Sequence, residues 1–260
     1  NLLLKEDPKN AAARSISDKI KDQSSKNKFG VSYDFIAFDK QFDNPWHLAS
    51  VSYGRSTSIG SVIGRFNYAN RFTNGAVQFE ADAYPRISKT FYSYISGGIS
   101  NKSGVFPQYR AGFSLYANLP KSFEAEAGFR YLYFSSATWI YTSSIGKYFK
   151  NYWFNFRTYL TPGNNNISQS YSLTTRYYFG GAEDYLSLGL GTGISPDDRS
   201  NNIQLGNVYK LKSNGISAGY NKTIKQLNTI SITGSWTHQE YLQNTFGNQF
   251  NFGVSYQQRF

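Results

Sequence analysis

The chain has 260 residues, a formal net charge of +11, no cysteine or methionine, and 18% aromatic residues. The lack of cysteine excludes disulfides and cysteine nucleophiles, and no stretch approaches the roughly 18 consecutive apolar residues that a membrane-spanning helix requires. The lysines lie mainly near the N-terminus and in turns, without a zinc-finger, helix-turn-helix or RNA-recognition signature, so nucleic acid is not an expected partner.

Residues 1–28 have a helical pattern. Ile16 and Ile20 recur at helical spacing among charged residues, and Pro8 suits a helix start. The run Asp7-Pro8-Lys9-Asn10-Ala11-Ala12 resembles the junction between tetratricopeptide repeats. We predict a helical domain over 1–28, the end of such a repeat region, and a second domain over 29–260. The missing Met and signal peptide indicate a mature or trimmed chain.

From Phe29 onward the hydrophobic period is two. Residues 76–86 and 123–133 alternate apolar and polar side chains, which is typical of a strand with one face in each environment. Turn signals separate about 14 such segments. They fall near 29–40, 46–56, 60–72, 75–86, 90–100, 108–118, 122–134, 138–148, 152–161, 168–179, 184–194, 211–223, 226–238 and 247–260.

These segments are too long for an ordinary soluble sandwich, whose strands average about five or six residues, but they suit tilted strands that cross a bilayer. Long and short connections tend to alternate, and the stretches 101–106, 195–210 and 240–246 are expected to be long. We predict an all-β, transmembrane, antiparallel up-and-down barrel of about 14 strands, with 12 or 16 as alternatives. An even number places both termini in the periplasm of a bacterial outer membrane.

Charged residues of the predicted strands lie mainly on one parity, the parity that faces the lumen of a membrane barrel. Arg55 is an exception that shares the parity of Val51 and Tyr53, at a strand end where it could reach the headgroups. The lumen-lining candidates are Asp34, Arg65, Glu80, Asp82, Arg110, Glu124, Glu126, Arg130, Arg157, Arg176 and Arg259. A simple hairpin puts Arg65 directly across from Asp82, and Glu124 and Glu126 are expected to meet Arg110 or Arg130. The set predicts either a salt-bridged network that stiffens the barrel or a charged constriction that selects what passes.

The tryptophans Trp46, Trp139, Trp153 and Trp236 lie near predicted strand ends. Most of the Tyr and Trp residues near strand ends are therefore expected to form interfacial girdles. The alternative is a set of sugar-binding aromatic side chains in a channel.

The last strand carries the most specific local feature. Gly253 precedes alternating aromatic residues that include Tyr256 and end at Phe260, a pattern that resembles the signal recognised by the outer-membrane assembly machinery. The aromatic parity of this strand marks the lipid face and predicts that the strand closes against the one that begins near Phe29.

Some outer-membrane barrels are lipid-modifying hydrolases, so the two histidines were considered as a catalytic pair. His47 and His238 are both expected at the outer rim, with Ser235 and Glu240 near the second. Both share the parity of apolar neighbours, which predicts that they face outward. We therefore expect no enzyme activity, no cofactor and no metal, and keep an outer-leaflet hydrolase as a minor alternative.

Five stretches in order resemble the YaiO-type outer-membrane barrel family, especially members from Bacteroidota. They are Phe42-Asp43-Asn44-Pro45-Trp46-His47, Tyr84-Pro85-Arg86, Phe129-Arg130-Tyr131, Thr138-Trp139-Ile140-Tyr141 and Gly193-Ile194-Ser195-Pro196-Asp197-Asp198. The resemblance spans roughly 29–260, and it implies a barrel that often follows tetratricopeptide repeats. It carries no catalytic residues.

By analogy with polysaccharide exporters that join periplasmic repeats to a barrel, the leading hypothesis is a conduit, or part of one, for an envelope or extracellular glycan. The alternative is a plugged structural barrel that anchors a periplasmic or surface complex. Expected partners are outer-membrane lipid and lipopolysaccharide, the barrel assembly machinery, a glycan and periplasmic proteins.

Overall fold

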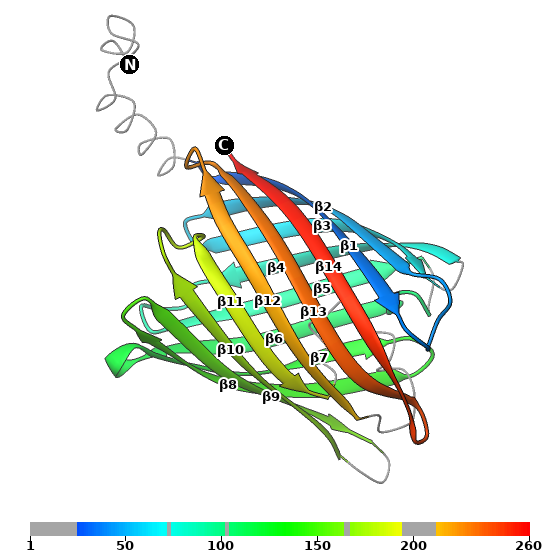
Figure 1. Ribbon diagram of the computed structural model, residues 1–260. Helices are drawn as coiled ribbons and strands as arrows, with labels where there is room; N and C mark the ends of the chain where they lie inside the picture. The colour runs from blue at the N-terminus through cyan, green and yellow to red at the C-terminus, as the bar shows by residue number, and fades with distance from the viewer. Residues whose placement is uncertain (1–24, 72–73, 102–103, 164–166, 194–211) are drawn as a thin grey trace, which may run out of the picture.

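The computed structural model describes residues 25–71, 74–101, 104–163, 167–193 and 212–260, and these form one closed antiparallel barrel of 14 strands (Figure 1). The predicted fold class and strand number are confirmed, and the alternatives of 12 and 16 strands are wrong. The strands are β1 (Asn27–Phe38), β2 (Trp46–Thr57), β3 (Gly60–Arg71), β4 (Asn74–Pro85), β5 (Phe91–Ser100), β6 (Tyr109–Leu119), β7 (Phe123–Tyr133), β8 (Ala137–Phe149), β9 (Tyr152–Pro162), β10 (Ile167–Tyr178), β11 (Tyr185–Thr192), β12 (Ser213–Ile224), β13 (Asn228–Leu242) and β14 (Thr245–Arg259).

The barrel has two unlike ends. One end, here the terminal rim, carries the start of β1 and the end of β14, where Lys28 pairs with Arg259. Its connections are short, and the one between β6 and β7 is the 3-10 turn η1 (Pro120–Ser122). The other end, here the loop rim, carries the three longest connections, at 39–45, 101–108 and 193–212.

The last connection on the loop rim differs from the expectation. A long link was predicted at 240–246, but β13 and β14 continue through most of it and leave only Gln243 and Asn244 between them. Asn244 adopts a positive φ of 59°, which asparagine tolerates. Its backbone N–H donates to Glu240 at 2.7 Å, so the side chain of a strand residue closes a tight turn.

The first strand begins two residues before the predicted boundary. Asn27 exchanges both backbone hydrogen bonds with Phe260, each at 3.0 Å, so the ladder reaches into the segment predicted as helix. Asn27 and Lys28 therefore belong to the barrel wall. The rest of the predicted helix and repeat trace, over residues 1–24, lies outside the described residues.

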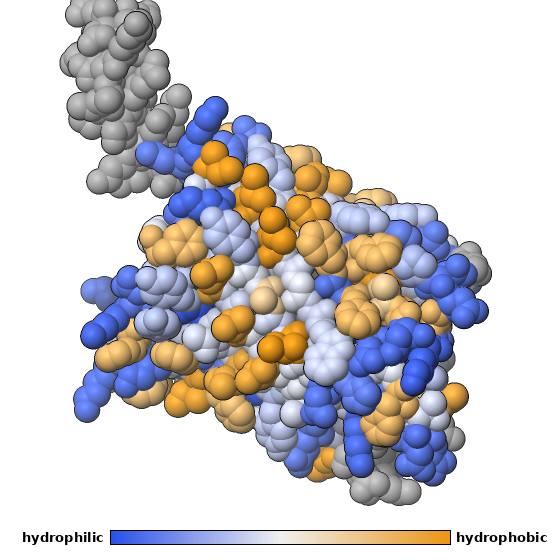
Figure 2. Space-filling model, in the orientation of Figure 1, coloured by the Kyte–Doolittle hydropathy of each residue, from blue (hydrophilic) through white to orange (hydrophobic). Residues whose placement is uncertain are grey.

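The wall has an apolar outer face. Exposed large apolar side chains recur at every second position, as in Val31, Tyr33 and Phe35 of β1. Figure 2 shows hydrophobic side chains spread across the wall and hydrophilic ones gathered toward the ends. In water such a surface would be unfavourable, whereas lipid tails accommodate it. Among the described residues, no helix is long and apolar enough to span a membrane.

The tryptophans divide between the two faces. Trp139 and Trp236 are 46% and 43% exposed on the outer face, as the girdle prediction requires. The prediction is wrong for Trp46 and Trp153. Trp46 is buried beneath the guanidinium of Arg71, and Trp153 lies under that of Arg176, so both rings point into the lumen.

Part of the interior at the loop rim is an apolar zone. Val105 and Phe106, from the connection between β5 and β6, fold inside the wall against Leu48, Ala69 and Ala76. A second buried cluster, of Leu132, Phe134, Ile140 and Tyr159, lines β7, β8 and β9 at the same end. The apolar zone fills only part of this end, because Arg71 and Gln239 are also buried inside the wall there. Toward the terminal rim the interior is polar.

Candidate functional site

The polar zone begins with a ladder of ion pairs across β3, β4 and β6. The Arg65 guanidinium contacts Glu80, at 3.3 Å from Nε to Oε2, and also Asp82. Arg110 reaches the other oxygen of Glu80, and Asn67 donates to Glu80 at 2.9 Å. Every oxygen of this buried carboxylate is therefore engaged, which offsets the cost of its burial.

The predicted register of this hairpin is wrong by two residues. Arg65 pairs directly with Glu80, and Asp82 lies opposite Ile63. A shift of two residues keeps every side chain on its own face. The expected contact between Arg65 and Asp82 consequently forms as a diagonal one.

A second group of ion pairs surrounds Glu126 of β7. Its side chain is fully buried between Arg130, at 3.6 Å, and Arg157 of β9. Ser144 donates to the same carboxylate at 3.1 Å, and Arg130 donates to Ser114 at 2.8 Å. The predicted meeting of Glu126 with Arg130 is thus confirmed.

The neighbouring carboxylate Glu124 has a different partner from the one expected. It accepts a hydrogen bond from the Tyr92 hydroxyl at 2.9 Å. Arg110, the other expected partner of these two glutamates, pairs with Glu80 in β4.

Inward-facing tyrosines complete the site, although they were not among the predicted lumen-lining residues. Tyr84 and Tyr94 lie 5.3 Å apart, and Tyr92 stacks on Tyr116 with ring centroids 4.6 Å apart. The Arg130 guanidinium lies 4.8 Å from the Tyr94 ring centre. Strand parity was the available signal, because these tyrosines share the face of the charged residues.

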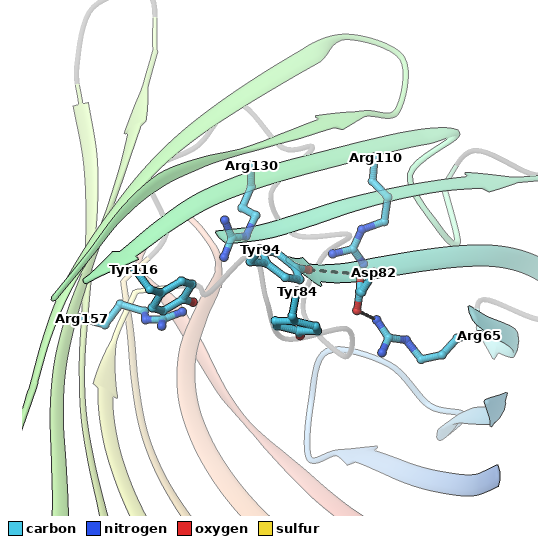
Figure 3. A pocket seen from close by; sticks show the side chains of 8 residues that line it. All are labelled: Arg65, Asp82, Tyr84, Tyr94, Arg110, Tyr116, Arg130 and Arg157. Atoms are coloured by element: carbon cyan, nitrogen blue, oxygen red, sulfur yellow. Dashed lines mark hydrogen bonds and ion pairs between the residues drawn. The ribbon is translucent and has the colours of Figure 1, made fainter. Parts of the chain in front are cut away.

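These side chains surround a cavity of about 270 Å³ inside the wall. Figure 3 shows its lining residues pointing toward one another from neighbouring strands: Arg65, Asp82, Tyr84, Tyr94, Arg110, Tyr116, Arg130 and Arg157. A second cavity, of about 760 Å³, lies at the terminal rim, and its wall includes Tyr84, Arg86, Lys89 and Tyr92. Tyr84 lines both cavities, so the two lie next to each other along the lumen.

The other predicted lumen residues also face inward, but away from this cavity. Arg176 lies over the rings of Trp153 and Tyr185, at 4.8 and 4.6 Å from their centres. Arg259 donates to the Gln226 carbonyl at 2.8 Å. Asp34 lies beside Gly253, where any side-chain carbon on the glycine would collide with the carboxylate.

The residues of the predicted assembly signal lie on both faces of β14. Gly253 is buried on the inner face, whereas Tyr256 and Phe260 are exposed on the outer face. The Tyr256 hydroxyl donates to Asn228 at 2.6 Å. Recognition of this strand by an assembly machinery stays a prediction.

Asp184, in the connection between β10 and β11, links this connection to β12 at the terminal rim. It accepts backbone N–H bonds from Thr223 at 2.6 Å and Gly181 at 3.3 Å, and lies 3.6 Å from Lys222. Burial alone would raise the pKa of this carboxyl, but the backbone donors and the lysine outweigh it and lower the pKa below its usual value.

Both histidines lie on the outer side of the wall. His47 shares a hydrogen bond of 2.6 Å with the Tyr33 hydroxyl, and His238 stacks on Phe246 with ring centroids 5.3 Å apart. Among the described residues, no group of three His, Cys, Asp or Glu side chains could hold a metal ion.

A closed barrel with an apolar exterior and a charged interior defines an outer-membrane β-barrel. The family comparison is more specific, since the model of the YaiO membrane beta barrel domain matches residues 26–198. The chain belongs to this family. A search of the curated proteins found no match.

Several solved structures share the architecture. A bacterial polysaccharide outer membrane secretin aligns over 91% of this chain and 99% of its own, with a TM-score of 0.58 and 8% identity. The CymD monoaromatic hydrocarbon channel aligns over 97% and 93%, with a TM-score of 0.58 and 9% identity. Omp33 of Acinetobacter baumannii aligns over 91% and 98%, with a TM-score of 0.53 and 12% identity.

Proposed function

We propose that the barrel forms a conduit, or part of one, for an envelope or extracellular glycan. The observation that carries the proposal is the pair of adjacent polar cavities that share Tyr84. Together they extend from the terminal rim into the middle of the lumen.

The chemistry of the lining favours a saccharide. The rings of Tyr84 and Tyr94 offer flat apolar faces with a polar edge, which suit the apolar face of a sugar ring. Guanidinium groups donate several fixed hydrogen bonds, which suit neighbouring sugar hydroxyls. The similar fold named as a polysaccharide secretin supports the same substrate class.

In this proposal the terminal rim faces the periplasm and the loop rim faces the exterior. Short connections on the periplasmic side and longer ones outside are usual for such barrels, and the three longest connections of this barrel lie at the loop rim. Outer-membrane lipid and lipopolysaccharide would cover the apolar face, and periplasmic proteins would deliver the glycan to the terminal rim. Neither a cofactor nor an enzymatic step is part of the proposal.

A plugged barrel is the second candidate function, and the loop rim favours it. Val105 and Phe106 are only 3% and 2% exposed where they fold into the lumen. An apolar constriction of this kind opposes the passage of water and ions even where space remains. In the plugged form the barrel would anchor a periplasmic or surface complex.

Single-channel conductance of the purified protein in planar bilayers tests the choice. Stable openings that neutral or charged oligosaccharides block support the conduit. Replacing Tyr84 and Tyr94 by alanine should raise the conductance and weaken the block, whereas Tyr141→Ala, which removes a tyrosine from the lipid face, should change neither. A silent bilayer with a correctly folded barrel would overturn the conduit in favour of the plugged barrel.

A further inference from the structure

Each arginine of the inner cavity is already paired with a carboxylate. Arg65 and Arg110 pair with Glu80, and Arg130 and Arg157 pair with Glu126. An anion that enters the cavity would have to displace these buried carboxylates. The free energy lost by breaking the existing ion pairs would exceed the free energy gained from the new contacts. The inner cavity is therefore poorly suited to attract acidic groups.

The cavity at the terminal rim is different. Arg86 and Lys89 both line it. Among the residues that the structure describes, neither lies within ion-pairing distance of a carboxylate. The described residues that line this cavity include no carboxylate, and the nearby Glu124 accepts a hydrogen bond from the Tyr92 hydroxyl. Its mouth is consequently positive.

The two cations stand on an ordered turn. The backbone N–H of Arg86 donates to Ile59 at 2.7 Å, and Arg86 forms an isolated bridge with Tyr92. The Ser88 hydroxyl accepts the N–H groups of Thr90 and Phe91, at 3.1 and 2.9 Å. The backbone of the turn that carries Lys89 is thus ordered without a ligand, which lowers the conformational entropy lost on binding.

We propose that the cavity at the terminal rim, here the vestibule, selects acidic glycans. Arg86 and Lys89 bind a carboxylate, sulfate or phosphate group on a sugar, and the Tyr84 ring packs against the sugar ring. The inference rests on the proposed conduit and names its substrate class. Hydroxyl groups of Ser56, Ser61 and Ser88 in the same wall complete a polar lining suited to saccharide hydroxyls. Because Tyr84 also lines the inner cavity, a sugar unit bound in the vestibule lies directly beside the inner cavity.

Binding to the folded barrel in detergent tests the inference separately from conduction. Fluorescently labelled tetragalacturonate and maltotetraose serve as acidic and neutral probes, read by anisotropy at low salt. The wild type should prefer the acidic probe. Arg86→Ala with Lys89→Ala should weaken acidic binding about fivefold, as expected for two solvent-exposed charge contacts, and leave neutral binding unchanged.

The matched control removes one arginine and one lysine from the outer face near the same rim. Arg55→Ala with Lys147→Ala changes the net charge equally, so it should keep the preference for the acidic probe. Glu124→Gln, which removes the carboxylate near the vestibule, should strengthen acidic binding. Retained heat-modifiable migration in SDS gels verifies that each variant is folded.

Equal binding of both probes by the wild type, or full displacement of tetragalacturonate by an equal concentration of inorganic phosphate, would overturn the acidic-glycan site. The conduit would stand in that case if conductance is observed. Conversely, charge-dependent binding by a barrel that never conducts would reject the conduit and keep the vestibule as a binding site.

Discussion

Glu126 offers the sharpest test of how the lumen is held together. Its side chain has no exposed surface, and it is the shared carboxylate between Arg130, 3% exposed, and Arg157, 20% exposed. Glu126→Gln keeps the side-chain volume but removes the negative charge that pairs with both guanidinium groups. Breaking a buried pair costs about 3–5 kcal/mol, and the partial exposure of Arg157 favours the lower end, so we expect a loss of about 3 kcal/mol.

The assay is urea unfolding in phospholipid vesicles, followed by tryptophan fluorescence. Glu183→Gln is the control, because Glu183 is 37% exposed and lies 3.8 Å from Lys28; it should stay within about 0.5 kcal/mol of the wild type. Adding Arg157→Gln to Glu126→Gln should recover part of the loss, since one unpaired cation is removed. A loss below about 1 kcal/mol for Glu126→Gln, or no recovery, would refute the reasoning.

Three further changes probe the wall, the loop rim and the terminal rim. Gly128→Ala drives a methyl group into the backbone of β6 and should cost about 1–3 kcal/mol in the same unfolding assay, whereas Gly97→Ala, with no atom within 4 Å of the new carbon, should be neutral or stabilising. Phe106→Ala should raise single-channel conductance by opening the apolar zone, and Phe252→Ala on the lipid face should not; equal conductance in both would contradict the constriction. The lowered pKa of Asp184 means that its stabilising effect is present above the ordinary aspartate pKa of about 3.9 and is lost as the pH falls through the lowered value. The difference in unfolding free energy between the wild type and Asp184→Asn should therefore be full at pH 7 and vanish in strong acid, and a difference that grows on acidification would contradict this sign.

The alternation of side chains made the wall predictable. The alternation within a strand assigns its side chains to two faces without reference to any other strand. The inward direction of Arg65, Glu80 and Glu126 therefore followed from parity alone. The register did not, because it depends on the exact length of each turn. Arg65 consequently met Glu80 directly, two residues from the expected partner.

The filling of the lumen was not predictable in the same way. Val105 and Phe106 lie in a connection without any period, and their burial depends on Leu48 and Ala69, which are distant in sequence. The direction of Trp46 was missed because a tryptophan at a strand end suits either an interfacial girdle or an interior stack. The parity that Trp46 shares with Leu48 decides between them, and inside the wall its ring packs against Phe38 and the Arg71 guanidinium.

The seam between β1 and β14 constrains how the barrel is made. Lys28 meets Arg259 there, so the ring is completed by residues from opposite ends of the chain. Bringing such distant residues together carries the largest loop-closure entropy of any strand pair in the barrel. Until that step both edge strands offer open backbone hydrogen bonds to other chains. We therefore expect an unclosed barrel to aggregate more readily than a closed one, and truncating either end of the wall should leave the barrel unclosed.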